Sequence, residues 1–388
     1  MTSKKRRYAL VGAGLQGQAI AYDLLQDAKT SGLTIVDRDL AALKEIGKHL
    51  RCGSDCDHRV ALIEADCRDQ QAMAEIFRGH DVVIAAASYE LNLGLMQAAF
   101  EAGAHFCDLG GNNDVVERQF ALDDEAKRRG LKAVPDCGVA PGAVSIITRL
   151  GIDRLGQMPD TVKIRVGGLP ASPEGLLKYA LAFSVRGLFN ECLEPTEILR
   201  GGQLVKVPSL TGLERQRFEG LGALEAAFTS GGSSTLAKTF AGLIENLDYK
   251  TLRYPGHWRI WTMLRELGYL GEQEILVDGA AVNPRRLSEA LFEKILPHAV
   301  EDLLVLRVIL KHGRQEVRYD MIDRRSSAAP GHSAMQRTTG YSAAIIAKML
   351  ATGEIADLGV LRQELSVPAA RFAEEWRARG LILQEIIK

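Results

Sequence analysis

The sequence predicts an α/β protein: a doubly wound parallel sheet, followed by an α+β domain with a mixed sheet. From residue 8 to about residue 141, short apolar runs alternate with helical patterns, which is typical of strand–helix–strand units. Near Met158 strands continue without regularly interposed helices. The tail after residue 333 is too short for a core of its own, so we expect it to pack on the first domain. The predicted domains are 1–141 completed by 334–388, and 142–333.

Six apolar runs predict the strands of the first domain. The helical segments between them repeat apolar residues with a period of about 3.6, as around Met73 and Leu95. Right-handed crossovers then give a parallel sheet in the order 3-2-1-4-5-6, with ligands beyond the carboxyl ends of strands 1 and 4. The predicted strands are Tyr8–Val11, Leu33–Val36, Val60–Glu64, Asp81–Ala86, His105–Asp108 and Leu131–Val134.

The turn after the first predicted strand carries Gly12, Gly14 and Gly17 in the spacing G-x-G-x-x-G. The first glycine permits a tight turn, the second lets a pyrophosphate approach the backbone, and the third lets the helix pack closely on the strand. The helix that opens with Leu15 and Gln16 would present unpaired N–H groups and its positive dipole end to the phosphates. We therefore predict a Rossmann-type dinucleotide site.

The second predicted strand leads into Asp37, twenty positions after Gly17. A carboxylate at this place accepts hydrogen bonds from the adenosine ribose, and it would repel a 2′-phosphate. NAD is therefore the predicted cofactor in preference to NADP. Arg38 follows immediately and could offset that repulsion.

Other strand ends select further candidates, because the carboxyl ends of parallel strands meet at one edge of a sheet. Asp66 follows strand 3, where it could approach the adenine. Ala87 and Ser88 follow strand 4, beside the expected ribose and nicotinamide. Asp108 ends strand 5 and opens a loop with two glycines and two asparagines, which could contact a ligand through its backbone.

The second domain is predicted from less regular patterns. An amphipathic segment carries Tyr179, Phe183 and Arg186, and residues 326–333 have the composition of a linker before a helix over 343–351. A final helix includes Phe372 and Trp376. Further predicted strands are Thr161–Gly168, Leu224–Thr229, Lys250–Tyr254, Leu303–Leu310 and Glu316–Ile322, with helices around Trp258–Leu267 and Leu287–Ile295.

Composition and charge exclude several classes of partner. The formal net charge is −1 over 388 residues, so no large field favours nucleic acid. The basic run Lys4–Arg7 is expected to be a solvated tail, with a nuclear signal or nucleic-acid arm as the alternative. No run of about 18 apolar residues is present, so we expect no membrane span. We expect a cytoplasmic protein, because the predicted cofactor belongs to that compartment.

The six cysteines are expected to be reduced thiols. Cys52 and Cys56, with His58, resemble part of a metal site. No second ligand pair follows at zinc-like spacing, so we predict no metal.

Several sequence blocks resemble one family. They are Asp136–Gly142, Val166–Pro170, Thr251–His257 followed by Leu264–Gly268, and Thr338–Tyr341. In their order and spacing they resemble the saccharopine dehydrogenase-like oxidoreductases, most closely the L-lysine 6-dehydrogenase branch. The resemblance implies a Rossmann domain, a second domain for substrate and dimer contacts, a C-terminal return to the first domain, and a homodimer.

The chain departs from the family pattern at a few positions. Saccharopine reductases carry an acidic residue where this chain has Ala140, which favours the lysine dehydrogenase branch. That branch usually shows Tyr-Lys before Trp-Ser, where this chain has Tyr179-Ala180 and Phe183-Ser184. The loop after strand 4 often has proline where this chain has Ser88. These departures bear on the substrate more than on the fold.

The resemblance implies an oxidoreductase acting on an amino-acid C–N bond. The first expectation is oxidative deamination of the L-lysine ε-amine to the semialdehyde, which closes to a cyclic imine. The alternative is an imine-forming reductase of the saccharopine reductase or carboxynorspermidine dehydrogenase type, with an amino-acid or polyamine substrate. A non-catalytic NAD-binding protein is a third class. The chemistry requires a base that titrates near pH 7 and a cation for the substrate carboxylate.

Five residues are candidates for these roles. Asp108 could hold the amine or orient water, or else cap the next loop. His257 has a suitable unperturbed pKa for a base, or else simply starts a helix. Arg186 could clamp a carboxylate with its guanidinium, and Arg253 is the competing clamp. Tyr179 is either a ligand contact or part of the core.

Overall fold

The computed structural model describes residues 5–50, 58–181, 184–298, 301–327 and 330–388. The chain divides into two compact units. Unit 1 comprises residues 1–150, 326–332 and 336–382, and unit 2 comprises residues 151–325, 333–335 and 383–388. The first break falls within α7 (Ala143–Leu155), a few residues beyond the predicted boundary at 141. Each unit is therefore assembled from segments that lie far apart in the sequence.

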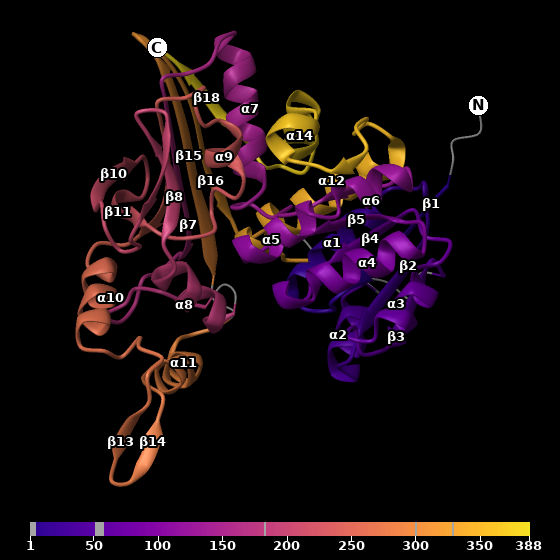
Figure 1. The fold of residues 1–388 in the computed structure, drawn as a ribbon, viewed down its shortest axis with the longest axis horizontal. Helices are drawn as coiled ribbons and strands as arrows, with labels where there is room; N and C mark the ends of the chain where they lie inside the picture. The colour runs from indigo at the N-terminus through magenta and orange to yellow at the C-terminus, as the bar shows by residue number, and fades with distance from the viewer. Residues whose placement is uncertain (1–4, 51–57, 182–183, 299–300, 328–329) are drawn as a thin grey trace. The chain divides into compact units, whose positions relative to one another are not determined.

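Unit 1 is built on a parallel sheet whose seven strands all lie within the described residues, in the order β17-β6-β5-β4-β1-β2-β3. Figure 1 labels the strands β1 to β5 of this sheet. The predicted order 3-2-1-4-5-6 is therefore confirmed, and β17 from the C-terminal segment extends it. The strands are β1 (Arg6–Val11), β2 (Thr30–Asp37), β3 (Val60–Glu64), β4 (Val82–Ala85), β5 (His105–Asp108), β6 (Lys132–Val134) and β17 (Gly359–Val360).

Helices cover both faces of this sheet because its strands are apolar on both sides. Ala9 and Val11 pack in one core cluster with the helices α3 and α4, which contribute Phe77 and Leu95. The intervening residues of β1 face the other side, where α12 packs against α1, β4 and β5. The helices before α7 are α1 (Leu15–Leu25), α2 (Leu40–Leu50), α3 (Gln70–Phe77), α4 (Asn92–Glu101), α5 (Asn113–Phe120) and α6 (Asp123–Arg128), with the 3₁₀ turn η1 (Tyr89–Leu91).

The C-terminal segment returns to unit 1. The predicted helix over 343–351 is observed as α12 (Tyr341–Thr352), after the π-helical turn η2 (Gln336–Gly340). The indole of Trp376 in α14 (Ala369–Ala378) donates a hydrogen bond to Ser342 Oγ at 3.0 Å, which ties the last helix to α12. The segment also contains α13 (Gln363–Ser366).

Unit 2 contains a mixed sheet of nine strands among the residues that the structure describes. Its main path is β10-β11-β12-β7-β15-β16-β18, and β8 pairs with both β12 and β9. Only β7 and β12 run parallel. The bounds are β7 (Thr161–Pro170), β8 (Thr196–Arg200), β9 (Gln203–Val207), β10 (Glu214–Phe218), β11 (Gly222–Phe228), β12 (Asn246–Arg253), β15 (Asp302–His312), β16 (Gln315–Arg324) and β18 (Gln384–Ile387).

The predicted fold class is confirmed, but the sequence patterns missed the polar strands. The strand β10 reads Glu-Arg-Gln-Arg-Phe and lacks the apolar alternation that marks a half-buried strand. Within the predicted amphipathic segment, α8 (Val185–Leu193) begins only after Ser184, whose hydroxyl accepts a hydrogen bond from Gly187 N at 3.2 Å. Tyr179 lies in irregular structure, and Phe183 lies outside the described residues.

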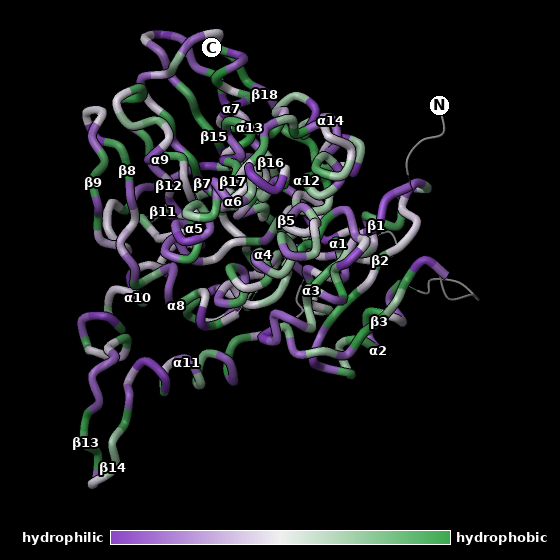
Figure 2. Tube along the Cα trace, turned by 45° about the vertical axis from the view of Figure 1, so that its right-hand side comes forward, coloured by the Kyte–Doolittle hydropathy of each residue, from purple (hydrophilic) through white to green (hydrophobic). Residues whose placement is uncertain are grey.

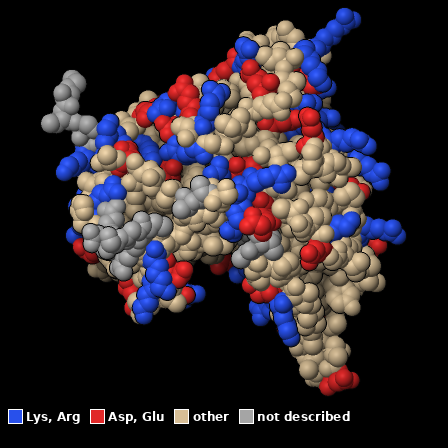
Figure 3. Space-filling model, turned by 180° about the vertical axis from the view of Figure 1, so that it is seen from behind, with Lys and Arg blue, Asp and Glu red and all other residues tan. Residues whose placement is uncertain are grey.

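A hairpin and two helices follow the last residues of β12. They are α10 (His257–Glu266), β13 (Ile275–Val277), β14 (Ala280–Val282) and α11 (Pro284–Ile295); the short α9 (Leu236–Thr239) precedes β12. The hairpin β13–β14 is a sheet of its own and extends away from α10 and α11 (Figure 1). Figure 2 colours stretches of both strands of this hairpin as hydrophobic. In Figure 3 the same projection is largely free of charged side chains except at its tip.

Candidate functional site

The turn between β1 and α1 requires two of its three glycines for folding. Gly12 has a φ of +107°, and a Cβ there would lie 2.6 Å from the carbonyl oxygen of Ala86. A Cβ on Gly17 would lie 2.0 Å from the carbonyl oxygen of Gly12. A Cβ on Gly14 would meet no described atom within 4 Å. Packing within the protein therefore does not explain the glycine at 14, whereas close approach of a ligand does.

The amino terminus of α1 is suited to an anion. Gly14 is the N-cap, and none of the described side chains caps the helix, so the N–H groups of its first turn are available. Leu15 is exposed at this end. Behind it, Gln336 Nε2 donates a hydrogen bond to Leu15 O at 2.8 Å. The C-terminal segment also packs closely on this end of α1, because a Cβ on Gly340 would lie 3.3 Å from Gln16 O.

Asp37 fixes the glycine turn against the end of β2. Its Oδ2 accepts a hydrogen bond from Ala13 N at 2.8 Å, and its Oδ1 accepts one from Asp39 N at 2.9 Å. Each carboxylate oxygen can accept a second hydrogen bond, so ribose hydroxyls can be bound as well. The Asp37 carboxylate is held in place and can still accept hydrogen bonds from a ribose, so it fits its predicted role in nucleotide binding.

Two guanidinium groups lie near the same strand ends. Arg68 pairs with Asp66 through Nε and Nη2, and this hydrogen bonding, with a smaller contribution from the charge of Arg38, lowers the pKa of Asp66 to about 2. Ala87 is half-buried and Ser88 is exposed, directly after β4. The predicted cofactor residues therefore all lie at the carboxyl ends of β1 to β4. Sequence reasoning missed Arg68, which no motif marks.

Asp108 is fully buried and connects the loops that follow β5 and β6 to the helix α5. Its Oδ1 accepts hydrogen bonds from Gly110 N at 2.7 Å and Asp136 N at 3.1 Å, and its Oδ2 accepts one from Gln119 Nε2 at 2.6 Å. Burial raises the pKa of this carboxyl, while these hydrogen bonds act against the rise. The geometry matches the loop-capping alternative, and a catalytic role for Asp108 stays a prediction.

In unit 2 the structure brings three of the predicted residues together. The Arg253 guanidinium lies over the Tyr179 ring, 4.9 Å from its centroid, and 5.6 Å from the centroid of the Trp258 ring. It also pairs with Glu191 at 3.7 Å, and the Thr251 hydroxyl donates to Glu191 at 2.6 Å. Arg253 is 3% exposed, and its Nε has no hydrogen-bond partner among the described residues. Glu191 and Trp258 were not predicted.

His257 completes this group in a neutral state. Its Nδ1 lies 2.8 Å from Leu177 O, so this nitrogen carries the proton, and the buried Nε2 has no partner within the described ranges. Burial, followed by the charge of Arg253, lowers the pKa of His257 to about 3. An imidazole with this pKa is an acceptor at neutral pH, whereas a general base needs a pKa near 7. The role of base stays a prediction that this environment disfavours.

Arg186 differs from this group because its side chain is exposed. It is exposed on the first turn of α8, whereas the guanidinium that contacts the Tyr179 and Trp258 rings is that of Arg253. Of the two predicted carboxylate clamps, Arg253 is therefore the one that the fold buries and orients.

The sequence predicts neither a metal site nor a membrane span. Among the described residues, no group of three or more His, Cys, Asp or Glu side chains could hold a metal. Cys52 and Cys56 lie outside those residues. No helix in the described part of the chain is long and apolar enough to cross a membrane.

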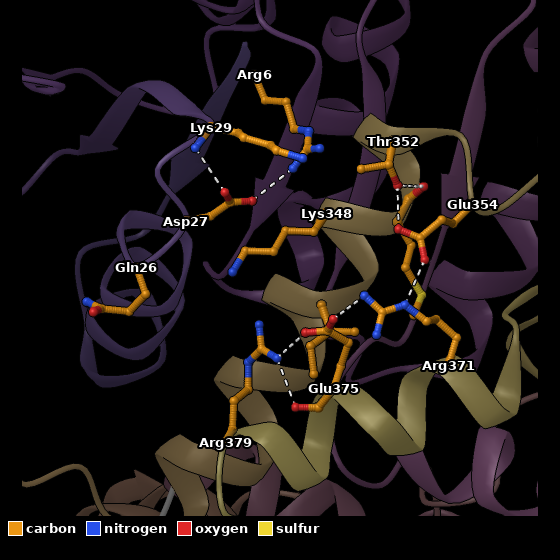
Figure 4. A pocket seen from close by; sticks show the side chains of 12 residues that line it. Arg6, Gln26, Asp27, Lys29, Lys348, Thr352, Glu354, Arg371, Glu375 and Arg379 are labelled. Carbon is orange, nitrogen blue, oxygen red and sulfur yellow. Dashed lines mark hydrogen bonds and ion pairs between the residues drawn. The ribbon is translucent and has the colours of Figure 1, made fainter. Parts of the chain in front are cut away.

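A charged cavity of about 400 Å³ lies elsewhere in unit 1, where β1 and β2 begin (Figure 4). Its walls carry ion pairs: Arg6 with Asp27 at 2.8 Å, and Arg371 with Glu354 at 3.1 Å. Strands that start here end at the glycine turn, so the cavity lies at the opposite edge of the sheet from the nucleotide residues. Lys348 of α12 and Arg379, the residue after α14, both pair with Asp23 of α1, which joins these helices to α1.

Comparison with family models decides the family. The model described as the saccharopine dehydrogenase NADP binding domain matches residues 9–134, and the one described as the saccharopine dehydrogenase C-terminal domain matches residues 138–381. The chain belongs to the saccharopine dehydrogenase family. It is thus an oxidoreductase of that family with an NAD(P)-binding domain, and the uncapped helix end above Gly14 fits such a cofactor.

Individual relatives refine the comparison. The chain is 21% identical to carboxynorspermidine synthase of Vibrio cholerae over 387 residues, covering 91% of each chain. It is 29% identical over 145 residues to carboxyaminopropylagmatine dehydrogenase of Synechocystis, covering 36% of each chain. Saccharopine dehydrogenase (L-Glu forming) from Saccharomyces cerevisiae has the same fold, with a TM-score of 0.78, 19% identity, and coverage of 99% of this chain and 100% of that one. These comparisons confirm the family but point to carboxynorspermidine synthase rather than to the predicted lysine 6-dehydrogenase branch.

Gly14 and Gly17 differ in their packing, so their alanine variants form a matched pair that tests cofactor binding at this turn. Gly14→Ala is expected to leave the thermal unfolding midpoint unchanged, because its φ of −71° suits alanine and the space is open. It should weaken NAD(P)H binding at least ~10-fold, because the new methyl group would meet the pyrophosphate. Gly17→Ala should instead lower the free energy of unfolding by about 1–3 kcal/mol. Fluorescence titration with NADH and NADPH, and thermal unfolding, measure the two effects. Unchanged affinity in Gly14→Ala would exclude a pyrophosphate above this glycine.

Proposed function

We propose that the protein is an NAD(P)H-dependent reductase that joins an amine to an aldehyde through an imine. The observation that carries the proposal is the similarity to carboxynorspermidine synthase across 91% of both chains. The shorter match, to carboxyaminopropylagmatine dehydrogenase, is also to a protein named for a carboxylated polyamine-like molecule. The substrate class proposed here is accordingly a primary amine of the polyamine type and an aldehyde that carries an amino-acid carboxylate.

The proposed reaction needs only the amine, the aldehyde, the reduced cofactor and a proton. The amine nitrogen attacks the aldehyde carbon, a C–N bond forms, and water leaves to give the imine. The reduced cofactor supplies the hydride that, with a proton taken up by nitrogen, converts the imine into a secondary amine. Because water is lost in the first step and would reverse it, the residues around the imine need to exclude bulk water.

The buried group in unit 2 supplies suitable contacts for such substrates. We assign Arg253 to the substrate carboxylate, because its buried Nε lacks a protein partner among the described residues and a guanidinium matches a carboxylate in shape and charge. His257 offers a neutral acceptor at Nε2 for an amine N–H. Tyr179 and Trp258 hold the guanidinium by their ring faces. Asp108 is assigned to positioning of the loops after β5 and β6 rather than to proton transfer.

We propose NAD as the preferred cofactor, because the Asp37 carboxylate lies at the end of β2 with room to bind ribose hydroxyls. Arg38 and Arg68 act in the other direction, since their charges would attract a 2′-phosphate. The balance between these charges sets the preference.

Oxidative deamination of L-lysine is the second candidate. Ala140 favours it, since saccharopine reductases carry an acidic residue at this position. The full-length similarity to carboxynorspermidine synthase favours the reductase.

A coupled assay separates the candidates. The full-length protein is mixed with NADH or NADPH, an amino-acid semialdehyde, and a panel of diamines and agmatine. Loss of absorbance by the reduced cofactor is expected only when aldehyde and amine are both present. Reduction of NAD by L-lysine alone, without any coupling activity, would establish the second candidate and sink the first. Cofactor binding with turnover in neither assay would indicate a non-catalytic protein.

The two arginine candidates give a matched pair of variants. Arg253→Lys is expected to raise the KM for the carboxylated aldehyde ~10- to 100-fold, because a lysine cannot make the two-pronged contact. The effect on kcat should be smaller, and Arg186→Lys should leave the KM unchanged. Steady-state kinetics measures both, with thermal unfolding as the control for folding. A rise in KM in Arg186→Lys alone would transfer the clamp to α8.

Removal of the Asp37 charge tests the cofactor preference. Asp37→Ala should shift the ratio of kcat/KM values for NADPH and NADH at least ~10-fold toward NADPH, because the repulsion of a 2′-phosphate is lost. Damage to the glycine turn would lower both values together, so the ratio isolates the electrostatic effect. Asp39→Ala, two residues further on, is the matched control. A constant ratio in Asp37→Ala would contradict the ribose role.

A further inference from the structure

The charged cavity of unit 1 is lined by more bases than acids. Its volume of about 400 Å³ lies within the range of ~300–1,000 Å³ that is common for small-molecule sites. Among the described residues, five bases and three acids line it, whereas the whole chain carries 48 Lys and Arg against 49 Asp and Glu. The bases are Arg6, Lys29, Lys348, Arg371 and Arg379, and the acids are Asp27, Glu354 and Glu375. Positive charge is therefore concentrated at this place.

Each acid that lines the cavity already has a base of the protein as its partner. The pairs are Asp27 with Arg6, Glu354 with Arg371, and Glu375 with both Arg371 and Arg379. A cationic ligand would have to displace one of these arginines before it could bind a carboxylate. The walls therefore disfavour amines and other cations as ligands.

The bases, by contrast, keep N–H donors that the protein does not use. The ammonium group of Lys29 has no partner among the described residues, although the backbone N–H of Lys29 binds Asp27 at 2.9 Å. Lys348 directs one hydrogen bond to the carbonyl and one to the carboxylate of Asp23, so a third N–H remains. Asp27 takes one of the five N–H groups of Arg6. Donors for an anion are therefore present in the cavity walls.

These donors lie on different sides of the cavity. Figure 4 shows Arg6 and Lys29 on one side, Arg371 and Arg379 on the other, and Lys348 between them. The first two come from β1 and the turn before β2, and the others come from α12, from α14 and from the residue after α14. The side chains of Arg6, Lys348 and Arg379 are only 13%, 16% and 13% exposed. Their contacts with a ligand would be partly shielded from water, where charges interact more strongly.

We propose that this cavity binds a small multivalent oxyanion, which carries two or more negatively charged carboxylate or phosphate groups. One end of the ligand would contact Arg6 and Lys29, and the other end would contact Arg371 and Arg379. A monovalent anion could occupy one side only, and an apolar molecule would leave the charged walls without partners. The excess of bases over acids and the two-sided arrangement thus favour the same class of ligand.

The ligand of this cavity would act as an effector and not as a substrate. The strands that begin here end at the glycine turn, so the cavity lies at the opposite edge of the sheet from Gly14 and Asp37. Bound there, the anion would join α12 and α14 to the start of the sheet and would stabilise the folded state. The inference does not rest on the proposed reaction, because its test measures binding alone.

Isothermal titration calorimetry of the full-length protein tests the proposal, with citrate and pyrophosphate as probes. NADH and NADPH are both present, so that pyrophosphate does not bind at the nucleotide site. At constant ionic strength we expect at least one probe to bind ~10-fold or more tightly than acetate, which carries a single charge. Binding of citrate alone would identify a polycarboxylate ligand, and binding of pyrophosphate alone a polyphosphate. Binding of both would identify the multiple charge as the recognised feature. If neither probe binds more tightly than acetate, the proposal is wrong.

A matched pair of lysine variants locates the binding. Lys29→Glu should weaken binding of the probe at least ~10-fold, because it reverses the charge of the unpartnered ammonium group. Lys44→Glu, at an exposed lysine of α2 that does not line the cavity, should bind as the wild type does. Both side chains are exposed, so thermal unfolding should show that both variants fold. Equal weakening in the two variants, or unchanged binding in Lys29→Glu, would overturn the proposal.

Amide hydrogen exchange gives a second measurement that needs no variant. The bound probe should slow exchange at least ~3-fold in α14 and in the turn that contains Lys29, because it links these segments. Slower exchange confined to the residues around Gly14 or Arg253 would place the anion at the cofactor or substrate residues and would overturn the proposal.

Discussion

Close packing around α1 is the constraint on which unit 1 depends. Gly17 lets the helix rest on the turn at Gly12, and Gly340 lets the C-terminal segment reach the same helix, since a Cβ there would lie 2.7 Å from that of Ala19. These contacts join β1, α1 and a segment from more than 300 residues further along the chain. They also leave the first-turn N–H groups of α1 facing away from the protein. The amino-terminal end of α1, which is the predicted cofactor end, is therefore held in position by the close contacts at Gly17 and Gly340.

The return of the C-terminal segment places ion pairs around the charged cavity of unit 1. Asp23, near the end of α1, pairs with Lys348 at 3.0 Å and with Arg379 at 2.6 Å, so it connects α1 to α12 and to the residue after α14. In the cavity walls, Arg6 pairs with Asp27 and Arg371 pairs with Glu354. In unit 2 the opposite holds, since Arg253 and His257 are buried with nitrogen atoms that lack described partners. Buried groups of this kind are costly unless a ligand completes their hydrogen bonds, and this supports the assignment of Arg253 and His257 to the substrate.

Sequence reasoning could predict a nucleotide site because local patterns mark its candidate residues. Gly12, Gly14 and Asp37 occupy fixed offsets along one strand, turn and strand, and parallel strands bring their carboxyl ends to one edge. It did not find Arg68, Gln119 or Glu191, because their roles come from contacts that no motif marks. Arg186 and Arg253 were both candidates for the carboxylate clamp, because the sequence around a single arginine does not tell whether its side chain is buried or exposed.

The sequence by itself determined the α/β class, the strand order of unit 1, the glycine turn and the family. The first three follow from short-range periodicity and spacing, and the family follows from the resemblance of several sequence blocks; the chain carries both whatever its tertiary arrangement. Only the tertiary structure decided that Asp108 has one oxygen bound by loop N–H groups and the other by Gln119 of α5, and that burial beside Arg253 lowers the pKa of His257 to about 3. It alone showed that Leu287, Leu291 and Ile295 face away from unit 2. Burial and the partners of a charged group depend on segments that meet only when the chain folds, so no local pattern encodes them.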